Sequence, residues 1–331
     1  AEVYGPAMFI TCLVVYTAML WFEKREKPAS DRYLVFIAFL LYLGTAIHLT
    51  VMIMLPPLFL FIIFSSPEKR KDPIFWFTWA VLFSVATTFN IFLVTMAFGL
   101  VVTLIGFLVT AVSSVSSGWV KRSFGVSLIT LFLALSAFGI STYTLIRSGL
   151  DPLIDENNPE TIEKFADYMN RKQYGQESMW ESMFNRKGQW KNQIGVHPRM
   201  GFWGFFEQQW SSPEASLRGI IPFLVALIGI IMFYRKHPKF WWILVMALVV
   251  GTLGLIIYIN FSDGTQGIKL EVRDRDYFFT PGYMFFAGWI GIGIGAIMYM
   301  FNRLRKQAGL HGAVSLVLAV LFTLVPAIPL K

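Results

Sequence analysis

A dense group of charged residues lies in the segment "EVRDRDYFFTPGYMFF", residues 271–286, directly before an apolar run. Arginine binds phosphate through paired charge-assisted hydrogen bonds, so Arg273 and Arg275 are candidates for holding the phosphate of a lipid-linked substrate. Asp274 and Asp276 are expected to orient these arginines and are candidate catalytic carboxylates. The same pattern is equally consistent with a membrane anchor, because charged side chains at the end of a spanning helix extend to the headgroups.

Three further residues, Glu2, Tyr4 and His48, could contribute to the same chemistry. Glu2 lies beside Tyr4 at the start of the first run, where its carboxylate is either solvated or positions an acceptor hydroxyl or an arginine. His48 follows "YLGTAI" inside a long apolar segment. It is expected to be either a hydrogen-bonded packing residue or a contact to the substrate phosphate.

The composition indicates an all-α protein that crosses a membrane several times. Of its 331 residues, 56% are apolar and only 15% are charged, which is not the composition of a soluble domain. The single cysteine, Cys12, excludes an intrachain disulfide, and the four histidines are too scattered for a zinc motif. The identity of any bound metal stays unknown, although Asp274 and Asp276 could contribute to a divalent-ion site.

The apolar runs predict about ten membrane crossings, because roughly twenty residues span the hydrocarbon core. Two of the runs are too long for one crossing and are expected to form hairpins that turn near His48 to Val51 and near Asn90 to Phe92. The runs cover residues 3–22, 33–65, 74–116, 124–146, 217–234, 241–260, 281–301 and 311–329.

Basic residues predict the orientation in the membrane, because Lys and Arg accumulate in short cytoplasmic loops. Five connectors contain 15 Lys and Arg against 5 Asp and Glu, and all five fall on one side of a ten-crossing bundle. The charge of +8 is therefore explained by topology, which argues against a nucleic-acid partner. The connectors are residues 23–32, 67–73, 120–123, 235–239 and 302–306.

This topology predicts transmembrane helices in 1–146, a periplasmic cap in 147–216, and further transmembrane helices in 217–331 with an outer loop at 261–280. The expected location is a bacterial inner membrane. Because the chain begins outside and enters the membrane at once, we expect helices upstream of Ala1, and we expect the chain to continue after Lys331.

The predicted cap, 147–216, is rich in charged residues and contains four tryptophans. Ile162, Phe165 and Met169 are spaced as on one face of a helix, which predicts an amphipathic helix that ends near Gly175. The aromatic residues of the cap suit the recognition of sugars or peptides, but an interfacial aromatic belt has the same composition.

The glycines of "GWIGIGIG", residues 288–295, resemble a dinucleotide-binding pattern only superficially. They follow no predicted strand and lie inside an apolar span. Small residues at such positions allow two helices to approach closely, so the pattern predicts helix packing.

Three stretches together resemble a family of bacterial membrane proteins that was long described as a domain of unknown function. It is related to a vertebrate multi-pass protein O-mannosyltransferase. The stretches are "AEVYGPAMF" at 1–9, "DENNPETIEKFADYMNRKQYG" at 155–175 and "EVRDRDYFFTPGYMFFAGWIGIGIG" at 271–295.

The resemblance implies the GT-C architecture, with a polyprenyl-phosphate sugar as donor and an active site on the outer face. The implied reaction transfers a hexose to a hydroxyl of a protein or another exported acceptor, and the expected hexose is mannose. In this architecture an acidic residue of the first outer loop acts in catalysis, and that loop is expected to precede Ala1. By itself the chain is therefore expected to be inactive. Metal dependence varies among enzymes of the GT-C architecture.

The matching positions give a set of implied site residues. Glu2, Asp274 and Asp276 are the implied catalytic carboxylates, and Arg273 and Arg275 are the implied phosphate-binding residues. His48 is added to the implied phosphate-binding residues because of its place in the chain. Acceptor recognition or loop structure is assigned to Tyr4, Asn157, Asn158, Tyr174 and Tyr277.

Two other classes of function stay open. The first is a lipid or solute transporter or flippase. Such proteins are expected to have inverted repeats and charged residues at mid-membrane, and the sequence displays neither. A non-enzymatic subunit of a larger membrane assembly is the other alternative. The expected partners are membrane lipids, the lipid-linked sugar donor, an exported protein acceptor and, in an assembly, other subunits.

Overall fold

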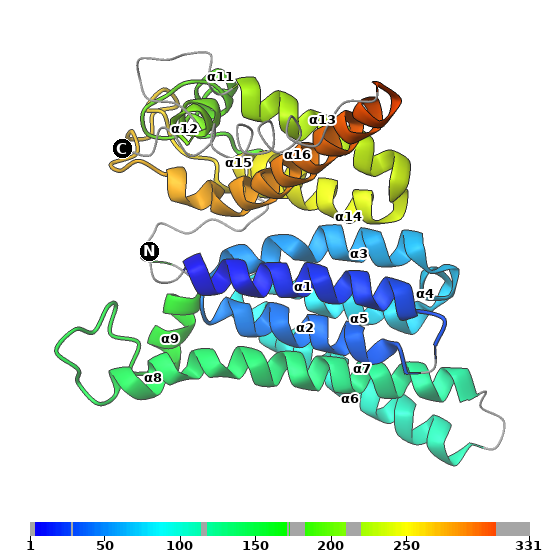
Figure 1. Cartoon of the computed structure of the whole chain (residues 1–331). Coiled ribbons are helices and arrows are strands. Elements are labelled where there is room, and N and C mark those ends of the chain that lie inside the picture. Colours follow the sequence, from blue (N-terminus) through cyan, green and yellow to red (C-terminus); the bar gives the residue numbers. More distant parts are fainter. Residues whose placement is uncertain are drawn as a thin grey trace. The chain divides into compact units, whose positions relative to one another are not determined.

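The computed structural model describes residues 4–27, 29–113, 118–170, 172, 183–209 and 220–308, and the regular structure within these ranges is helical (Figure 1). The chain divides into two compact units, Ala1–Phe184 and Asn185–Lys331, which are described separately below. The division falls inside the segment 147–216, for which the sequence predicts a cap.

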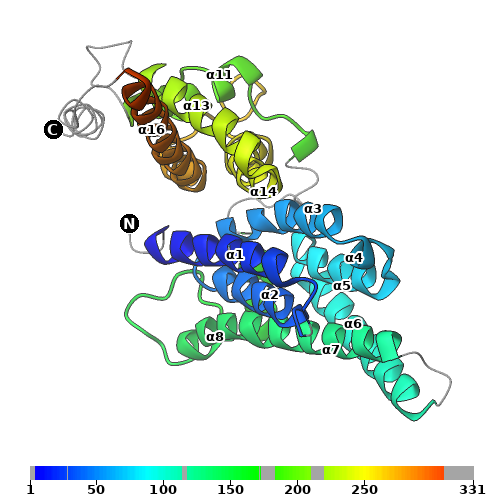
Figure 2. The same ribbon diagram turned by 45° about the vertical axis from the view of Figure 1, so that its right-hand side comes forward.

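Unit 1 is a layered bundle of antiparallel helices. Helix α2 packs against α1 and α7, and α7 packs against α6 (Figures 1 and 2). Large aromatic side chains fill the interior, and Trp21, Tyr42 and Phe92 are almost completely buried. The elements are α1 (Tyr4–Lys24), α2 (Asp31–Thr45), η1 (Leu49–Met54), α3 (Leu55–Ser65), α4 (Pro67–Lys71), α5 (Pro73–Phe83), η2 (Ser84–Ala86), α6 (Phe89–Val112), α7 (Gly118–Phe138), η3 (Gly139–Thr142), α8 (Tyr143–Ser148) and α9 (Ile162–Met169).

Hydrogen bonds between side chains and neighbouring helices hold this bundle together. The hydroxyl of Tyr42 donates to the carbonyl oxygen of Leu82 over 2.6 Å and joins α2 to α5. Thr78 donates to Ser127 over 2.7 Å and joins α5 to α7. Such interhelical bonds are typical of helices in a membrane, where hydrophobic burial alone does not drive association.

The hairpin predicted at His48 to Val51 is present. Helix α2 ends at Thr45, and His48 is the N-cap of η1, which leads into α3. The second hairpin turns at Thr87 and Thr88, slightly before the predicted position. The turn lies there because the Thr87 hydroxyl bonds the Ser84 carbonyl, and the side chain of Asn170 accepts a 2.7 Å bond from the N–H of Phe89.

The predicted amphipathic helix corresponds to α9, which ends at Met169 and therefore earlier than the predicted end near Gly175. The side chain of Thr161 caps its first turn by accepting from the N–H of Lys164, and Phe165 is buried. Asn170 ends the helix, and the same residue fixes it to the start of α6. Residues 173–175 lie outside the described ranges.

Unit 2 is built around the close contact between α13 and α16. A Cβ atom added at Gly293 would overlap the carbonyl oxygen of Val225, so only glycine allows this approach. Helix packing is thus confirmed for Gly293, whereas Gly288, Gly291 and Gly295 face open space. The elements are α11 (Trp190–Ile194), α12 (Phe202–Gln208), α13 (Ile220–Lys236), α14 (Pro238–Val249), η5 (Val250–Gly254), α15 (Leu255–Ile259), η6 (Asp276–Phe279) and α16 (Thr280–Ala308).

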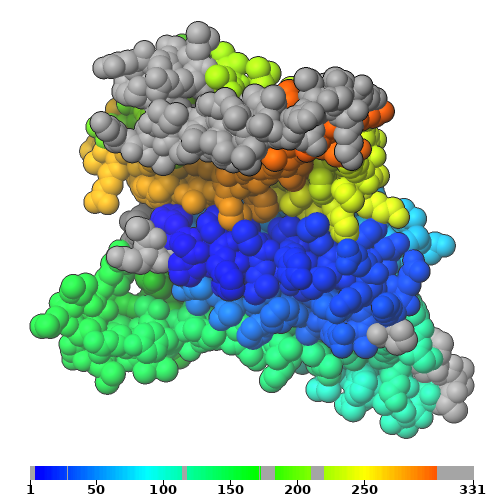
Figure 3. Space-filling model, viewed as in Figure 1, coloured from blue at the N-terminus to red at the C-terminus, as the bar shows by residue number. Residues whose placement is uncertain are grey.

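The long apolar helices make this chain a multi-pass membrane protein. Among the described residues, five helical segments are long and apolar enough to cross a membrane: Tyr4–Lys24, Phe89–Val112, Gly118–Ser148, Pro238–Ile259 and Asp276–Arg303. Leu49–Ser65 and Pro73–Ala86 are shorter apolar helices. Helix α1 lies at the surface of unit 1 (Figure 3), and its Phe9 is 67% exposed, as expected of a side chain that faces lipid. The predicted count of ten is not established, and the run 311–329 lies outside the described ranges.

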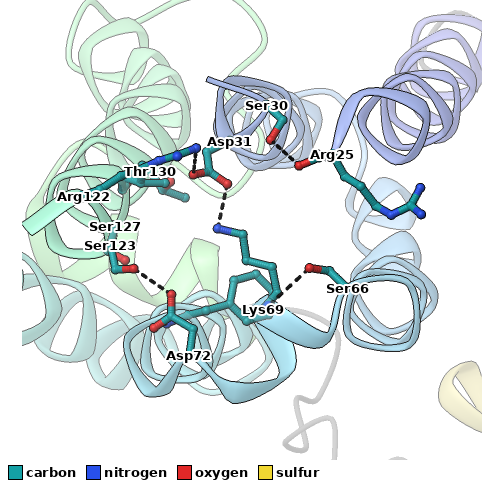
Figure 4. A network of polar contacts seen from close by, with 12 residues as sticks. Arg25, Ser30, Asp31, Ser66, Lys69, Asp72, Arg122, Ser123, Ser127 and Thr130 are labelled. Carbon is teal, nitrogen blue, oxygen red and sulfur yellow. Dashed lines mark hydrogen bonds and ion pairs between the residues drawn. The ribbon is translucent and has the colours of Figure 1, made fainter. Parts of the chain in front are cut away.

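Three of the basic connectors meet at one end of unit 1, as the sequence predicts. Asp31 at the start of α2 accepts ion pairs from Lys69 over 2.6 Å and from Arg122 over 2.8 Å (Figure 4). Nearby, Asp72 caps α5 and accepts a 2.8 Å hydrogen bond from Ser123. In unit 2, Lys236 lies 4.0 Å from the centroid of the Tyr299 ring.

We expect Asp31→Asn to destabilise unit 1 by about 3 kcal/mol, because it leaves the buried ammonium of Lys69 without its counter-ion. Thermal unfolding of the purified protein measures this loss. The control Asp167→Asn removes a pair with Lys172 whose side chains are 53% and 62% exposed, and it should change stability by less than about 1 kcal/mol. Equal losses in the two variants would contradict a special role for the Asp31 pair.

Candidate functional site

The predicted outer loop follows α15, and Asn260 sets its direction. This residue adopts a left-handed conformation, with φ of 52°, which asparagine tolerates better than most residues. Its side chain donates to the carbonyl of Asn185 over 2.6 Å and accepts from the N–H of Lys187 over 2.9 Å. Segment 185–193 is thereby fixed to the beginning of the loop.

Asp263 is the second point at which these segments are joined. Its carboxylate accepts from the N–H of Gln189 over 2.9 Å, from the amide of Asn192 over 2.6 Å and from the hydroxyl of Thr265 over 2.6 Å. Burial acts to raise the pKa of Asp263, but these hydrogen bonds outweigh it and hold the pKa well below the ordinary value.

Asp263→Asn should lower stability by about 2 kcal/mol at neutral pH, because an amide replaces a charged acceptor of several hydrogen bonds. Since the pKa is lower in the folded than in the unfolded protein, the stabilisation by the carboxylate is complete above the unfolded pKa of about 4. It is lost as the pH falls toward the folded pKa. Melting temperatures of both proteins from pH 7 to pH 3 should therefore converge on acidification; a constant difference would contradict this assignment.

Arg275 is held in place at the end of the loop. Its Nε and Nη2 donate to one oxygen of Glu271 over 3.1 Å and 2.9 Å, and its Nη1 donates to the hydroxyl of Tyr277 over 2.9 Å. Burial acts to lower the pKa of Arg275, but the bonds to Tyr277 and Glu271 raise it above the ordinary value. A guanidinium has five N–H groups, so these contacts leave part of its donor capacity for a ligand.

Arg273 and Asp274 are exposed and form no hydrogen bond or ion pair within the described part of the chain. The residue that orients Arg275 is Glu271, for which no role was predicted. Within the described part of the chain, neither Asp274 nor Asp276 forms a hydrogen bond or ion pair with Arg275. Arg199 adds a third cation, because its guanidinium donates to the carbonyl oxygen of Val272. This cation balances the excess of one carboxylate over the two arginines in 271–276.

An apolar cavity of about 180 Å³ lies in the same unit. The hydroxyl of Tyr283, one of its lining residues, is buried and has no hydrogen-bond partner among the described residues. Asp276, at the end of the charged loop, interacts electrostatically with Tyr283. The exposed lining of the cavity is therefore almost entirely apolar. It is lined by Phe202, Trp203, Phe206, Phe223, Ala226, Leu227, Ile230, Leu248, Thr252, Gly282, Tyr283 and Phe286.

Two of the predicted site residues meet in unit 1. The rings of Tyr4 and His48 lie 4.8 Å apart between centroids. Nδ1 of His48 is 2.8 Å from the hydroxyl of Thr50 and accepts a hydrogen bond from the backbone N–H of Thr50. The His48 ring therefore caps η1. Its Nδ1 thus takes part in the hydrogen-bonded packing that was one of the two expectations for His48, and a contact to the substrate phosphate stays a prediction.

Asn157 and Asn158 shape the turn that follows α8. Both have positive φ angles, 67° and 42°. The side chain of Asn158 accepts from Ser148 over 3.2 Å and donates to Glu160 over 3.3 Å. The contacts of Asn158 lie within the loop, and a role of Asn157 or Asn158 in acceptor recognition stays a prediction. Glu2 and Tyr174 lie outside the described residues, and the roles predicted for them stay predictions.

Within the described ranges, no group of three or more His, Cys, Asp or Glu side chains is arranged to hold a metal ion.

The sequence itself relates this multi-pass membrane protein to one family. Residues 1–71 match the model described as the N-terminal domain of the protein O-mannosyl-transferase TMEM260. The relation to the vertebrate O-mannosyltransferase that the motifs predict is therefore supported. The matched range contains Tyr4 and His48 and ends before the Arg273–Tyr277 element. No curated protein and no solved structure matches the chain.

Proposed function

We propose that this chain forms part of a GT-C-type membrane glycosyltransferase. It transfers a hexose, which we propose to be mannose, from a polyprenyl phosphate to a hydroxyl of a protein or another exported acceptor. The family match supports an O-mannosyltransferase, because that is the activity in the description of the matched domain. The structural observation that carries the proposal is a charged loop that leads directly into a cavity-lining helix. The guanidinium of Arg275 is fixed at the end of the loop, and Gly282, Tyr283 and Phe286 of α16 line the apolar cavity.

In the proposed reaction, the oxygen of the acceptor hydroxyl forms a bond to the anomeric carbon of the sugar, and the bond from that carbon to the phosphate oxygen breaks. Negative charge then grows on the departing polyprenyl phosphate. Arg275, fixed by Glu271 and Tyr277, stabilises that charge without having to reorganise, and the exposed Arg273 closes on the phosphate from the other side. Glu2, Asp274 and Asp276 are the proposed carboxylates that position the acceptor and take its proton.

The cavity is the proposed site for the part of the isoprenoid chain nearest the phosphate. Its lining is almost entirely aromatic and aliphatic, which suits a branched hydrocarbon and offers little to a polar solute. Polar contacts to the phosphate would come from the charged loop, where Arg275 keeps N–H donors beyond those bonded to Glu271 and Tyr277. We propose that the donor phosphate binds at Arg275, and that the setting is a bacterial inner membrane with 147–216 outside.

Leu227→Trp should lower the kcat/KM for the polyprenyl-phosphate donor about tenfold, because the indole would occupy part of the cavity. The matched control is Leu224→Trp. Both leucines are on α13 and partly exposed, at 40% and 51%, but only Leu227 lines the cavity. The assay measures transfer of labelled mannose from the donor to a serine- and threonine-containing peptide, in membranes that contain the intact protein. Equal activity of the two variants would contradict binding of the isoprenoid chain in this cavity. Binding of the donor by the wild type without any transfer of sugar would favour a non-enzymatic subunit.

A further inference from the structure

Segment 185–193 lies directly on residues 260–263, where the charged loop begins. In addition to the two anchoring side chains described above, the amide of Gln193 donates to the carbonyl oxygen of Phe261 over 2.7 Å. Gln193 is 2% exposed and also accepts a hydrogen bond from Arg186, whose guanidinium binds backbone carbonyls at the end of α15. The proposed transferase reaction gives these contacts no role.

Glycine at position 188 allows the segment to lie this close. A Cβ atom added at Gly188 would be 2.8 Å from the carbonyl oxygen of Phe261 and 3.2 Å from the carboxyl carbon of Asp263. The first of these atoms belongs to the backbone and cannot move aside by changing rotamer. The place of the Asp263 carboxylate is therefore set by the backbone of the segment as well as by hydrogen bonds.

The same contacts determine where Glu271 lies. Its backbone N–H donates to the carbonyl oxygen of Ser262 over 3.1 Å, which closes the loop between the two residues. Ser262 is 3% exposed and directly precedes Asp263, so fixing Asp263 also fixes the carbonyl to which Glu271 is bonded. The carboxylate of Glu271 in turn binds Nε and Nη2 of Arg275. A continuous series of contacts therefore joins segment 185–193 to Arg275.

We propose that Asp263 is a positioning residue for recognition of the donor phosphate, and that it acts through Glu271 and Arg275. The proposal rests on the proposed function, in which Arg275 binds the phosphate. Each carboxylate oxygen of Asp263 already accepts two hydrogen bonds, so the residue acts indirectly. The physical basis is pre-organisation, because a guanidinium that is already held in place loses less conformational entropy when the ligand binds.

The direction of the effect distinguishes positioning from charge. Asp263→Asn removes a negative charge from the loop, and by charge alone this would strengthen the binding of an anion. Loss of positioning predicts weaker binding, because Arg275 would then have to be ordered by the phosphate itself. A role of Asp263 in stability alone predicts no change in how the folded protein distinguishes a phosphate from an alcohol.

The test compares binding of a polyprenyl phosphate and of the corresponding polyprenol by the purified intact protein. The affinity for the phosphate divided by the affinity for the alcohol isolates recognition of the phosphate, and it does not depend on the fraction of protein that is folded. We expect this ratio to fall about fivefold in Asp263→Asn and in Gly188→Ala. Gly188→Ala changes no charge, so it decides the question even where Asp263→Asn fails to fold.

Two further variants complete the experiment. In the background of Arg275→Ala, Asp263→Asn should cause no further fall in the ratio, because the two residues act in one series. Asp31→Asn is the matched control, since it also removes a buried carboxylate but belongs to unit 1. It should leave the ratio unchanged.

The possible results separate the roles of Asp263. A lower ratio in both Asp263→Asn and Gly188→Ala, with no further fall in the Arg275→Ala background, supports positioning. An unchanged ratio would overturn the inference and leave Asp263 as a stabilising residue, a higher ratio would overturn it in favour of a charge effect, and a further fall in the double variant would overturn the route through Arg275. These results leave the proposed function intact, whereas a wild type that binds the phosphate no more tightly than the alcohol would overturn both.

Discussion

Arg275→Ala should reduce sugar transfer by about 100-fold or more while the protein is still inserted and folded. Removing one pre-positioned donor from a developing anion typically costs two to three orders of magnitude in rate. The alanine variant loses the guanidinium that Glu271 and Tyr277 hold in place. The measurement is the initial rate of mannose transfer from polyprenyl phosphate, normalised to the amount of folded protein.

Lys269→Ala is the control for this prediction, because Lys269 is an exposed cation of the same loop and makes no ion pair within the described ranges. It should retain most of the activity. Arg275→Lys separates charge from geometry, since lysine keeps the charge but cannot bind Glu271 and a phosphate through a planar fork. We therefore expect sugar transfer by Arg275→Lys to be strongly impaired. Nearly normal transfer by Arg275→Ala would contradict the role of Arg275 in stabilising the departing phosphate.

Gly293→Leu should prevent the close packing of α13 on α16. A side chain at Gly293 would overlap the carbonyl oxygen of Val225, which belongs to the backbone and cannot move aside by changing rotamer. We expect a loss of about 3 kcal/mol or more, which corresponds to a fall of about 10 °C in melting temperature. Thermal unfolding followed by circular dichroism measures the change.

Gly291→Leu provides the matched comparison, because an added Cβ at that position meets nothing within 4 Å. Its melting temperature should stay within a few degrees of the wild type. A similar loss in both variants would mean that the general cost of replacing glycine, and not the contact with Val225, explains the effect.

The helical architecture could be predicted because hydrophobic length and charge placement are properties of contiguous sequence. The hairpin at His48, the helix at Phe165 and the meeting of the basic connectors at Asp31 all follow from such local patterns. The second hairpin turns earlier than predicted because Asn170, distant in sequence, accepts the hydrogen bond of Phe89. No local pattern contains that information.

The same distinction applies to the candidate site. The charge density of 271–276 was evident in the sequence, but the choice of Glu271 as the partner of Arg275 depends on the path of the loop. Arg199 was missed because nothing in its own neighbourhood indicates a contact with this loop. The four-residue spacing from Glu271 to Arg275 was the one signal that could have indicated their pairing.

Binding of an unglycosylated polyprenyl phosphate to the purified protein tests the central claim most directly, because it isolates recognition of the phosphate from catalysis. We expect the wild type and Lys269→Ala to bind with equal affinity and Arg275→Ala to bind at least about tenfold more weakly. The corresponding polyprenol, which lacks the phosphate, should bind weakly to all three and show no dependence on Arg275. Equal affinity of the wild type and Arg275→Ala for the phosphate would contradict the account.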